Sequence, residues 1–385
     1  MNRTKPIHYL IVIILAIAFM GLMRSRALKQ TSSFVDGSAN KHILEQEKHF
    51  KNLQQLTFSG ENAEAYFSSD SKKIIFQSHT GEGLCDQIYI MDLETGLTEM
   101  VSNGQGVTTC AYFQYPNNEK VIYASTHLQD KACPTPPDFS RGYVWKLYEG
   151  YDIFRSNLDG SGIEQVTNEA GYDAEATVAE DGSKIIYTSI SSGDLEVWTM
   201  NSDGSDKRML TNKLGYDGGP FFSHDGNKVV WRAYYPETDK EIKDYKNLIN
   251  ESMIRPMNLQ IRVMNTDGTG KIQVTNNEGA NFAPFFFPND ERIIFCSNMS
   301  DPQGRNFDLW AINIDGTNLE KITYYDGFDG FPIFSPDGKY FVFASNRNQV
   351  KPGDTNIFLA EWKFGGTPEL VLYYLPCKYK IVLNN

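Results

Sequence analysis

One position of a repeated segment carries an oxygen-bearing side chain in every copy. These residues have the types and the spacing that chemistry would need. Each stands five residues before the residue that aligns with Phe334. The set comprises Asn62, Thr109, Asp173, Asp217, Asn281 and Asp329. Such oxygens bind hard cations, so one interpretation is a polar ligand, or Ca²⁺ or another divalent cation on Asp173, Asp217 and Asp329. The alternative is structural: each side chain caps a loop of the neighbouring unit and spaces the ring. No obligatory cofactor is expected.

Further carboxylates follow two residues later, at Glu64 and Glu175. They would share a strand face with the preceding set. Acid–base chemistry by Asp173, Glu175 and Asp217 is one consequence, because clustered carboxylates raise one another's pKa. The sequence has no G-x-S-x-G elbow, and "DGTGK" (Asp267–Lys271) lacks the spacing of a phosphate-binding loop.

A second recurring motif is N-x-D-G, as in "NSDGSD" from Asn201. It could begin a calcium loop, but the copies lack the further oxygen ligands and the distal Glu that such a loop needs. It is also typical of a tight hairpin, in which Gly supplies a positive φ and Asn or Asp caps the turn. We therefore predict hairpin turns.

The elements that position these residues belong to an internal repeat. The segment "FSPDGKYFVFAS" (Phe334–Ser345) aligns with five others, beginning at Phe67, Gln114, Val178, Phe222 and Phe286. The aligned fourth residues are separated by 47, 64, 44, 64 and 48 positions. The shorter spacings fit a four-stranded propeller blade, and each unit contains four short β patterns separated by turn residues. The sequence predicts an all-β, six-bladed β-propeller of four-stranded antiparallel blades.

The expected organisation runs from a signal or anchor segment, through a linker, to the propeller and a short C-terminal tail. The boundaries are 1–29 for the anchor, 30–53 for the linker, 54–372 for the propeller and 373–385 for the tail. The blades are expected at about 59–102, 103–167, 168–211, 212–275, 276–323 and 324–372.

The strand that closes the sixth blade has two candidates. "QLTF" (Gln55–Phe58) resembles the ends of the other fourth strands although it precedes the first full unit. This favours closure by an N-terminal strand. The rival is "PELVL" (Pro368–Leu372).

Two blades carry extra segments, at 127–152 and 234–257, between their second and third strands. Both should lie on one face of the ring, here called the insertion face, and the N-x-D-G turns on the opposite, hairpin face. The first segment contains Tyr143 and Trp145, which could stack on a ligand. In the second, Thr238 with Glu241 forms a capping box that begins a helix.

The cysteines indicate a bond that fixes the first insertion. Cys85, Cys110 and Cys133 are disulfide candidates if the chain is exported. The preferred pair is Cys85–Cys133, with Cys85–Cys110 as its rival. Cys296 lies in an apolar strand and is expected to be a buried thiol.

An apolar run from Tyr9 to Met23, flanked by basic residues, predicts export. The run is short for a membrane span, and no clear cleavage site follows it. We expect an uncleaved anchor as the only membrane contact, with a cleaved signal peptide as the alternative. The net charge of −12 argues against nucleic-acid binding, which requires a basic surface.

The "FSPDG" and "N-x-DG…LT" units, over about residues 54 to 366, resemble the TolB-like propellers, exported bacterial proteins with WD-type repeats. The resemblance implies a six-bladed fold and a location on the periplasmic side of the bacterial cell envelope. It does not include the α/β domain that precedes the TolB propeller, because only Arg24–Asn52 separates the apolar run from the repeats.

The expected function is binding or scaffolding: recognition of an envelope protein, peptide or glycan on the insertion face. The candidate binding residues are those at the starts of the inner strands, together with Glu175, Tyr143 and Trp145. The alternative is a hydrolase or lyase that uses the carboxylates at the channel mouth, with or without a divalent metal.

Overall fold

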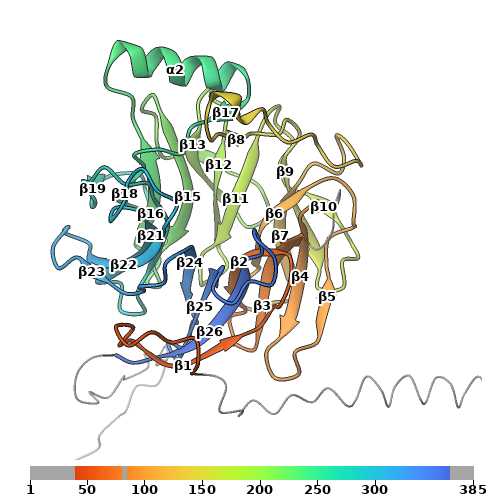
Figure 1. The fold of residues 1–385 in the computed structure, drawn as a ribbon. Helices are drawn as coiled ribbons and strands as arrows, with labels where there is room; N and C mark the ends of the chain where they lie inside the picture. The colour runs from red at the N-terminus through yellow and green to blue at the C-terminus, as the bar shows by residue number, and fades with distance from the viewer. Residues whose placement is uncertain (1–39, 80–84, 365–385) are drawn as a thin grey trace, which may run out of the picture.

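The computed structural model describes residues 40–79 and 85–364 of the 385-residue chain. These residues form six four-stranded antiparallel sheets and one two-stranded sheet. The six large sheets are arranged as blades around an axis (Figure 1), and adjacent blades meet through their first strands. The predicted all-β six-bladed propeller is therefore confirmed. The predicted anchor, residues 9–23, and the rival closing strand, residues 368–372, lie outside the described residues.

Each blade uses four strands that increase in distance from the axis. The first strands are β2 (Glu61–Phe67), β6 (Thr108–Phe113), β11 (Asp173–Val178), β15 (Tyr216–Phe222), β20 (Asn281–Phe286) and β24 (Asp329–Phe334). The second strands are β3 (Lys73–His79), β7 (Lys120–Ser125), β12 (Lys184–Ser189), β16 (Lys228–Tyr234), β21 (Arg292–Ser297) and β25 (Tyr340–Ser345). The third strands are β4 (Gln87–Asp92), β9 (Asp152–Asn157), β13 (Glu196–Asn201), β18 (Gln260–Asn265), β22 (Asp308–Asn313) and β26 (Asn356–Trp362). The fourth strands are β5 (Thr98–Met100), β10 (Glu164–Gln165), β14 (Arg208–Met209), β19 (Ile272–Gln273), β23 (Glu320–Lys321) and β1 (Phe50–Gln55).

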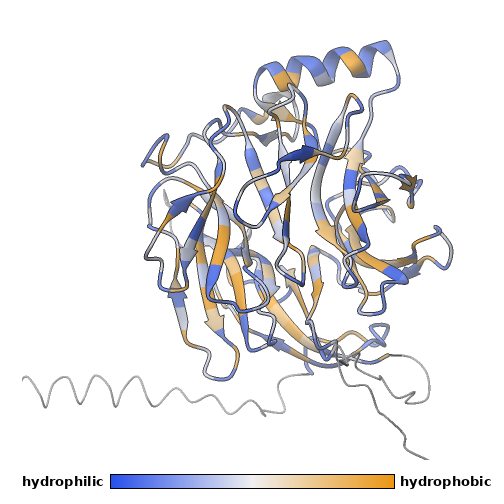
Figure 2. Ribbon diagram, turned by 180° about the vertical axis from the view of Figure 1, so that it is seen from behind, coloured by the Kyte–Doolittle hydropathy of each residue, from blue (hydrophilic) through white to orange (hydrophobic). Residues whose placement is uncertain are grey.

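The core lies between the blades. The second strands place apolar residues there that are 0% exposed, among them Ile74, Val121, Val229 and Ile293. Apolar stretches run along the middle of the strands, whereas the connecting loops are mostly polar (Figure 2). Burial of these β-branched residues on both sides of each sheet holds neighbouring blades together.

The N-x-D-G segments form the hairpins between third and fourth strands. In the copy at Asn201, the Asn side chain donates to Ser205 Oγ at 2.8 Å, and Asp203 Oδ1 accepts the Ser205 backbone N–H at 2.9 Å. Gly204 has a φ of +88°, a conformation that favours glycine. The carboxylate is therefore occupied by its own turn, as the hairpin interpretation requires.

The ring is closed by the N-terminal strand. β1 pairs antiparallel with β26, with Leu53 opposite Ala360, so blade six combines the two ends of the described chain (Figure 1). Of the two closures considered from sequence, this is the N-terminal one, but β1 (Phe50–Gln55) ends where "QLTF" (Gln55–Phe58) begins, so the strand itself lies earlier in the chain than expected. Closure by β1 prevents the outer edge of β26 from remaining unpaired.

A buried ion-pair cluster holds the N-terminal segment on blade six. Arg347 donates to Glu47 through both terminal nitrogens, at 3.1 and 2.9 Å, and to Asp329 Oδ2 at 2.7 Å. All three side chains are at most 3% exposed. Arg347 also lies over the rings of Phe343 and Phe358.

Replacement of Arg347 by Met should strongly destabilise the ring, because it leaves Glu47 and Asp329 as two buried carboxylates without a cation. We expect a loss of about 3–5 kcal/mol in the free energy of unfolding, measured with urea. The control is Lys51→Met, which removes an exposed partner of Glu361 and should leave the free energy of unfolding almost unaltered, because exposed ion pairs contribute little to stability. Equal losses in the two variants would contradict the role of the cluster.

Candidate functional site

The predicted ring of oxygen-bearing residues lies where each blade meets the one before it. The backbone N–H of each residue donates to the carbonyl that precedes the third strand of the previous blade; for Asp173 this is Tyr151, at 2.8 Å. The five residues placed in this way are Asn62, Asp173, Asp217, Asn281 and Asp329, each 0–2% exposed. The side chains of Asn62 and Asn281 also donate to the previous blade, at 2.8 and 2.7 Å, as the structural interpretation expects; for the other three residues the bond cited is from the backbone.

The threonine of the "LT" motif completes each junction. Its hydroxyl accepts the N–H of the second residue of the third strand, as in the 2.8 Å bond from Val197 to Thr211 Oγ1. The six hydroxyls are those of Thr57, Ser102, Thr167, Thr211, Thr275 and Thr323, with distances of 2.8 to 2.9 Å. The motif therefore marks a side-chain bond that ties the fourth strand to the third next to the blade junction.

The second blade requires a correction. Thr108, not Thr109, occupies the repeated position: it opposes Ser125 as Asn62 opposes Ser78, and its N–H donates to Asp86 O at 3.0 Å. The hairpin between β6 and β7 contains one more residue than its counterpart in the first blade. Because the sequence alignment began at Gln114, counting five residues back reached Thr109 instead of Thr108. Thr109 instead donates to Gln77 Oε1 at 2.6 Å.

The described residues contain no group of three or more His, Cys, Asp or Glu side chains placed to hold a metal ion. Asp173, Asp217 and Asp329 stand at three different blade junctions and do not converge. Each is bonded within the protein: Asp217 Oδ1, for example, accepts from Trp231 Nε1 at 2.6 Å and from Tyr235 Oη at 2.7 Å.

The channel at the centre is lined by a different set of residues. Every first strand contains a β-bulge, where its register with the second strand shifts. One residue in each bulge has a φ between +48° and +59°, and the bulge redirects that residue toward the axis. These residues are Glu64, Cys110, Glu175, Gly219, Ala283 and Phe331, and all six line one cavity.

Aromatic rings cross the axis on one side of this cavity. Tyr66 and Phe221 come from opposite blades, and their ring centroids are 5.7 Å apart. Tyr112 lies 5.3 Å from Tyr66, and Phe285 lies 5.4 Å from Phe221. Tyr66, Tyr112, Phe221 and Phe285 each stand two residues after a bulge residue, so they form the next layer of the channel and plug it toward the hairpin face.

The polar centre of the cavity is an ion pair between Glu175 and Arg232. Glu175 Oε2 also accepts from Thr188 Oγ1 at 2.7 Å and from the Gly219 N–H at 2.8 Å. A Cβ atom on Gly219 would overlap the Arg232 guanidinium, so glycine is required beside this pair. Sequence reasoning missed Arg232. The available signal was an arginine within the apolar strand "VVWRAY", where the aligned residues include Ala124 and Ala344.

Glu64 faces the same cavity from the opposite blade wall. Burial raises the pKa of Glu64 to about 7, and a hydrogen bond with the Cys110 thiol lowers it in part. Its Oε2 atom is buried and has no hydrogen-bond partner among the described residues. Arg232 Nε is likewise buried without a partner there. Both atoms belong to residues of the cavity wall, but they are themselves buried and have almost no accessible surface.

The two insertions interlock on the insertion face. β8 (Trp145–Lys146), from the first insertion, pairs antiparallel with β17 (Met253–Ile254), from the second. Leu147 N donates to Ser252 O at 2.8 Å, and Lys146 Nζ donates to Glu251 O at 2.8 Å. We call this paired unit, residues 127–152 and 234–257, the lid. It projects from the insertion face, next to blade three (Figure 1).

The helix expected in the second insertion is α2 (Asp239–Asn250). Thr238 and Glu241 form the predicted capping box. Tyr245 and Leu248 are buried, at 4% and 3% exposure, and Tyr245 Oη donates to Asp194 in blade three. The apolar side of the helix is thus used for packing onto the propeller.

The lid aromatics have different surroundings. Trp145 is partly buried: its ring lies 5.3 Å from the Arg232 guanidinium and 6.3 Å from the Tyr216 ring, so it connects the lid to the cavity wall. Tyr143 is 59% exposed and Phe139, in the short helix η1 (Phe139–Arg141), is 51% exposed. Their rings stack with centroids 6.0 Å apart. The lid therefore presents an aromatic pair to solvent.

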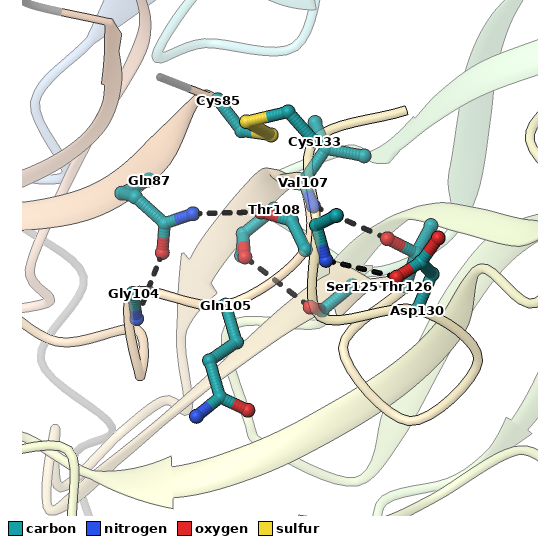
Figure 3. The surroundings of a disulfide bond; sticks show 12 residues. Cys85, Gln87, Gly104, Gln105, Val107, Thr108, Ser125, Thr126, Asp130 and Cys133 are labelled. Atoms are coloured by element: carbon teal, nitrogen blue, oxygen red, sulfur yellow. Dashed lines mark hydrogen bonds between the residues drawn. A yellow bond between two sulfur atoms is a disulfide. The ribbon is translucent and has the colours of Figure 1, made fainter. Parts of the chain in front are cut away.

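A disulfide joins Cys85, in the first blade, to Cys133 in the lid (Figure 3). This is the pairing preferred from sequence. Cys110 and Cys296 are free thiols. Next to the bond, Gln87 donates to Gly106 O at 3.0 Å and accepts from Gly104 N at 3.1 Å. The bond ties the irregular start of the lid to a rigid blade.

Removal of this disulfide should loosen the lid more than the ring. In a Cys85→Ser, Cys133→Ser variant we expect a loss of roughly 2–4 kcal/mol in the free energy of unfolding, because the bond closes a long loop. Hydrogen exchange should rise at residues 127–152 and stay unchanged in strands β20–β22, which serve as the internal control. Unaltered exchange at 127–152 would show that the bond does not hold the lid.

Stability should fall as the pH rises from 5 to 8, because burial raises the pKa of Glu196 to about 8 and that of Asp217 to about 7. The folded protein then binds more protons than the unfolded chain over this range. We expect the free energy of unfolding to decrease over this range, and to decrease less in Glu196→Gln. The control Glu361→Gln removes a carboxyl whose pKa is lowered, mainly by Lys51. It should leave the dependence of the free energy of unfolding on pH between 5 and 8 unaltered. A flat profile in the unmodified protein would refute the assignment.

Comparisons with solved structures place this architecture among known propellers. The putative TolB from Agrobacterium tumefaciens aligns with a TM-score of 0.53 at 17% identity, over 79% of this chain and 91% of that one. TolB from Acinetobacter baumannii aligns with a TM-score of 0.53 at 18% identity, over 70% and 55%. A gluconolactonase from Xanthomonas campestris aligns with a TM-score of 0.52 at 10% identity, over 82% of this chain and 91% of that one.

No protein-family model matches the sequence. Among the described residues, no helix is long and apolar enough to cross a membrane. In its fold, the chain is a six-bladed propeller similar to TolB.

Proposed function

We propose that this protein is an exported binding propeller that recognises a protein, peptide or glycan of the bacterial cell envelope through its lid. The observation that carries the proposal is the exposed aromatic pair Phe139–Tyr143 on a lid made from both insertions. The lid departs from an otherwise regular repeat, and long ordered loops on a rigid scaffold commonly carry function. Exposed aromatic residues are enriched where proteins bind partners.

Three features of the lid favour recognition by a preformed surface. The β8–β17 pairing joins the two insertions to each other, and the Cys85–Cys133 bond and the Tyr245–Asp194 hydrogen bond fix the lid to blades one and three. A surface that is ordered before binding loses less conformational entropy on association. The disulfide also supports export, because such bonds persist in oxidising compartments. The proposed tether is the apolar segment 9–23.

The binding role previously considered for Asn62, Asp173, Asp217, Asn281 and Asp329 is less favoured by the geometry, since these side chains are buried at blade junctions. The exposed lid residue Tyr143 is the better anchor. Trp145 fixes the position of the Tyr143 side chain, because Trp145 Nε1 donates to Tyr143 Oη at 3.1 Å.

The second candidate function, acid–base catalysis, is favoured by one observation. Glu64, rather than the junction carboxylates, combines a pKa of about 7 with a position on the channel cavity. A general acid or base works best with a pKa near the operating pH. A hydrolase or lyase of this kind would depend on Glu64 and not on Asp173 or Asp217.

The binding proposal is tested with peptide and glycan arrays, followed by titration of the strongest ligand by calorimetry. A Phe139→Ala, Tyr143→Ala variant should bind that ligand at least tenfold more weakly, because buried aromatic anchors dominate interface energies. The matched control is Leu97→Ala, since Leu97 is 61% exposed in the β4–β5 hairpin on the opposite face. Binding that survives the lid double substitution but is lost with Leu97→Ala would overturn the proposal.

A further inference from the structure

Blade four departs from the repeat at two neighbouring positions. The fifth residue of its second strand is Arg232, whereas the other five blades carry an uncharged residue there: Gln77, Ala124, Thr188, Cys296 and Ala344. Its bulge residue is Gly219, the one glycine among the six bulge residues. A Cβ atom on Gly219 would overlap the Arg232 guanidinium. Both departures therefore serve to place one buried arginine.

The guanidinium of Arg232 is held by blade three. It forms an ion pair with Glu175, and the two side chains are 10% and 13% exposed. The Glu175 carboxylate also accepts from Thr188 Oγ1 at 2.7 Å and from the Gly219 N–H at 2.8 Å. With three donors on one buried carboxylate, the pair has little freedom to move.

The lid contacts this guanidinium through Trp145. The guanidinium carbon of Arg232 lies 5.3 Å from the centroid of the Trp145 ring and 5.6 Å from that of the Tyr216 ring. The two rings meet edge to face, 6.3 Å apart. A guanidinium at this distance is attracted to an aromatic face, most strongly to that of Trp. Trp145 belongs to the insertion of blade two, so the contact joins the lid to blade four, at a place distinct from the disulfide to blade one.

Trp145 in turn contacts the exposed aromatic pair. Its Nε1 donates to Tyr143 Oη at 3.1 Å, and the ring planes of Tyr143 and Phe139 are 12° apart. Both members of the pair are more than half exposed, so packing against the propeller contributes little to their orientation. The contacts from Glu175 through Arg232 and Trp145 to Tyr143 are continuous from the channel wall to the surface of the lid.

We propose that Arg232, held by Glu175, is a positioning residue for the exposed aromatic pair and acts through Trp145. The channel ion pair orders the binding surface before a partner arrives, and a surface ordered in advance loses less entropy on association. A lysine would not replace Arg232, because only the planar guanidinium stacks on aromatic faces. The effect on affinity rests on the binding function proposed above. The positioning itself does not, and it is measured without a ligand.

The test follows the Trp145 indole by NMR in the full protein with ¹⁵N-labelled tryptophan. Arg232→Lys keeps a positive charge beside Glu175 but removes the planar face. In this variant, exchange of the Trp145 Nε1 proton with solvent should rise about fivefold or more, the size of a lost cation–π contact, and its NOE to the Tyr143 ring should weaken. The indoles of Trp198 and Trp310 serve as internal references and should not change.

The matched control is Arg262→Lys, in the same blade. It also removes a guanidinium from an aromatic ring, that of Tyr235 at 4.5 Å, and should leave the Trp145 signal unaltered. An unaltered Trp145 signal in folded Arg232→Lys, or an equal change in Arg262→Lys, would overturn the proposal.

A second variant replaces Arg232→Lys if thermal unfolding shows that it does not fold. Thr188→Val is close to isosteric and removes one of the donors to Glu175. Exchange of the Trp145 Nε1 proton should then rise by a smaller factor than in Arg232→Lys. No rise in Thr188→Val would likewise overturn the proposal.

The consequence for recognition is measured by titration with the peptide or glycan that binds most strongly on the arrays. Arg232→Lys should bind it about threefold to tenfold more weakly, because the aromatic pair must then be ordered on binding. Arg262→Lys should bind it as the unmodified protein does. Unaltered affinity in Arg232→Lys would contradict the role of positioning in recognition. Arrays without any ligand would overturn the binding function and not the positioning, which the NMR measurement decides.

Discussion

The structure depends on the junction between consecutive blades. At each junction a backbone N–H at the start of the first strand bonds to the previous blade, and a buried Asn, Asp or Thr side chain fills the remaining space. The hydroxyl of the "LT" motif then ties the fourth strand to the third. Because polar groups at these junctions have little access to water, most of them are bonded within the ring, although one carboxylate oxygen each of Asp173, Asp217 and Asp329 has no hydrogen-bond partner among the described residues. The repeated motifs supply the residues that form these junction hydrogen bonds.

The same constraint explains why the cavity is lined by unexpected residues. With the start of each first strand committed to a junction, the bulge residue is the first residue of the strand that is directed to the axis. In blades five and six this residue is Ala283 or Phe331, and in blade four it is Gly219. Blades one and three place Glu64 and Glu175 there, and Arg232 enters through the space beside Gly219. The charged residues of the channel thus come from blades one, three and four, and Arg232 lies beneath Trp145 of the lid.

Much of this could be predicted from sequence. Periodic turns and β-rich segments gave the six blades, the N-x-D-G hairpins, the helix begun by Thr238 and closure by a strand before Glu61, because each follows from local residue chemistry. The positions of the insertions also followed from their spacing within the repeat. Of the channel residues, Glu64 and Glu175 were singled out from the sequence. The other bulge residues and Arg232 were not, because a β-bulge changes which residue faces the axis without leaving a local signature. Thr109 was assigned to the repeated position instead of Thr108 because the β6–β7 hairpin is one residue longer than that of the first blade, which shifted the alignment by one residue. The β8–β17 pairing joins segments about 100 residues apart and has no sequence signal.

The account's central claim is that the insertion face is the working surface of this propeller. It is tested most directly by the hydrogen-exchange footprint of the strongest array ligand on the full protein. The account predicts protection of backbone amides within residues 127–152 and 234–257. Protection confined to the hairpins of the opposite face, such as residues 202–205 and 266–269, would contradict it.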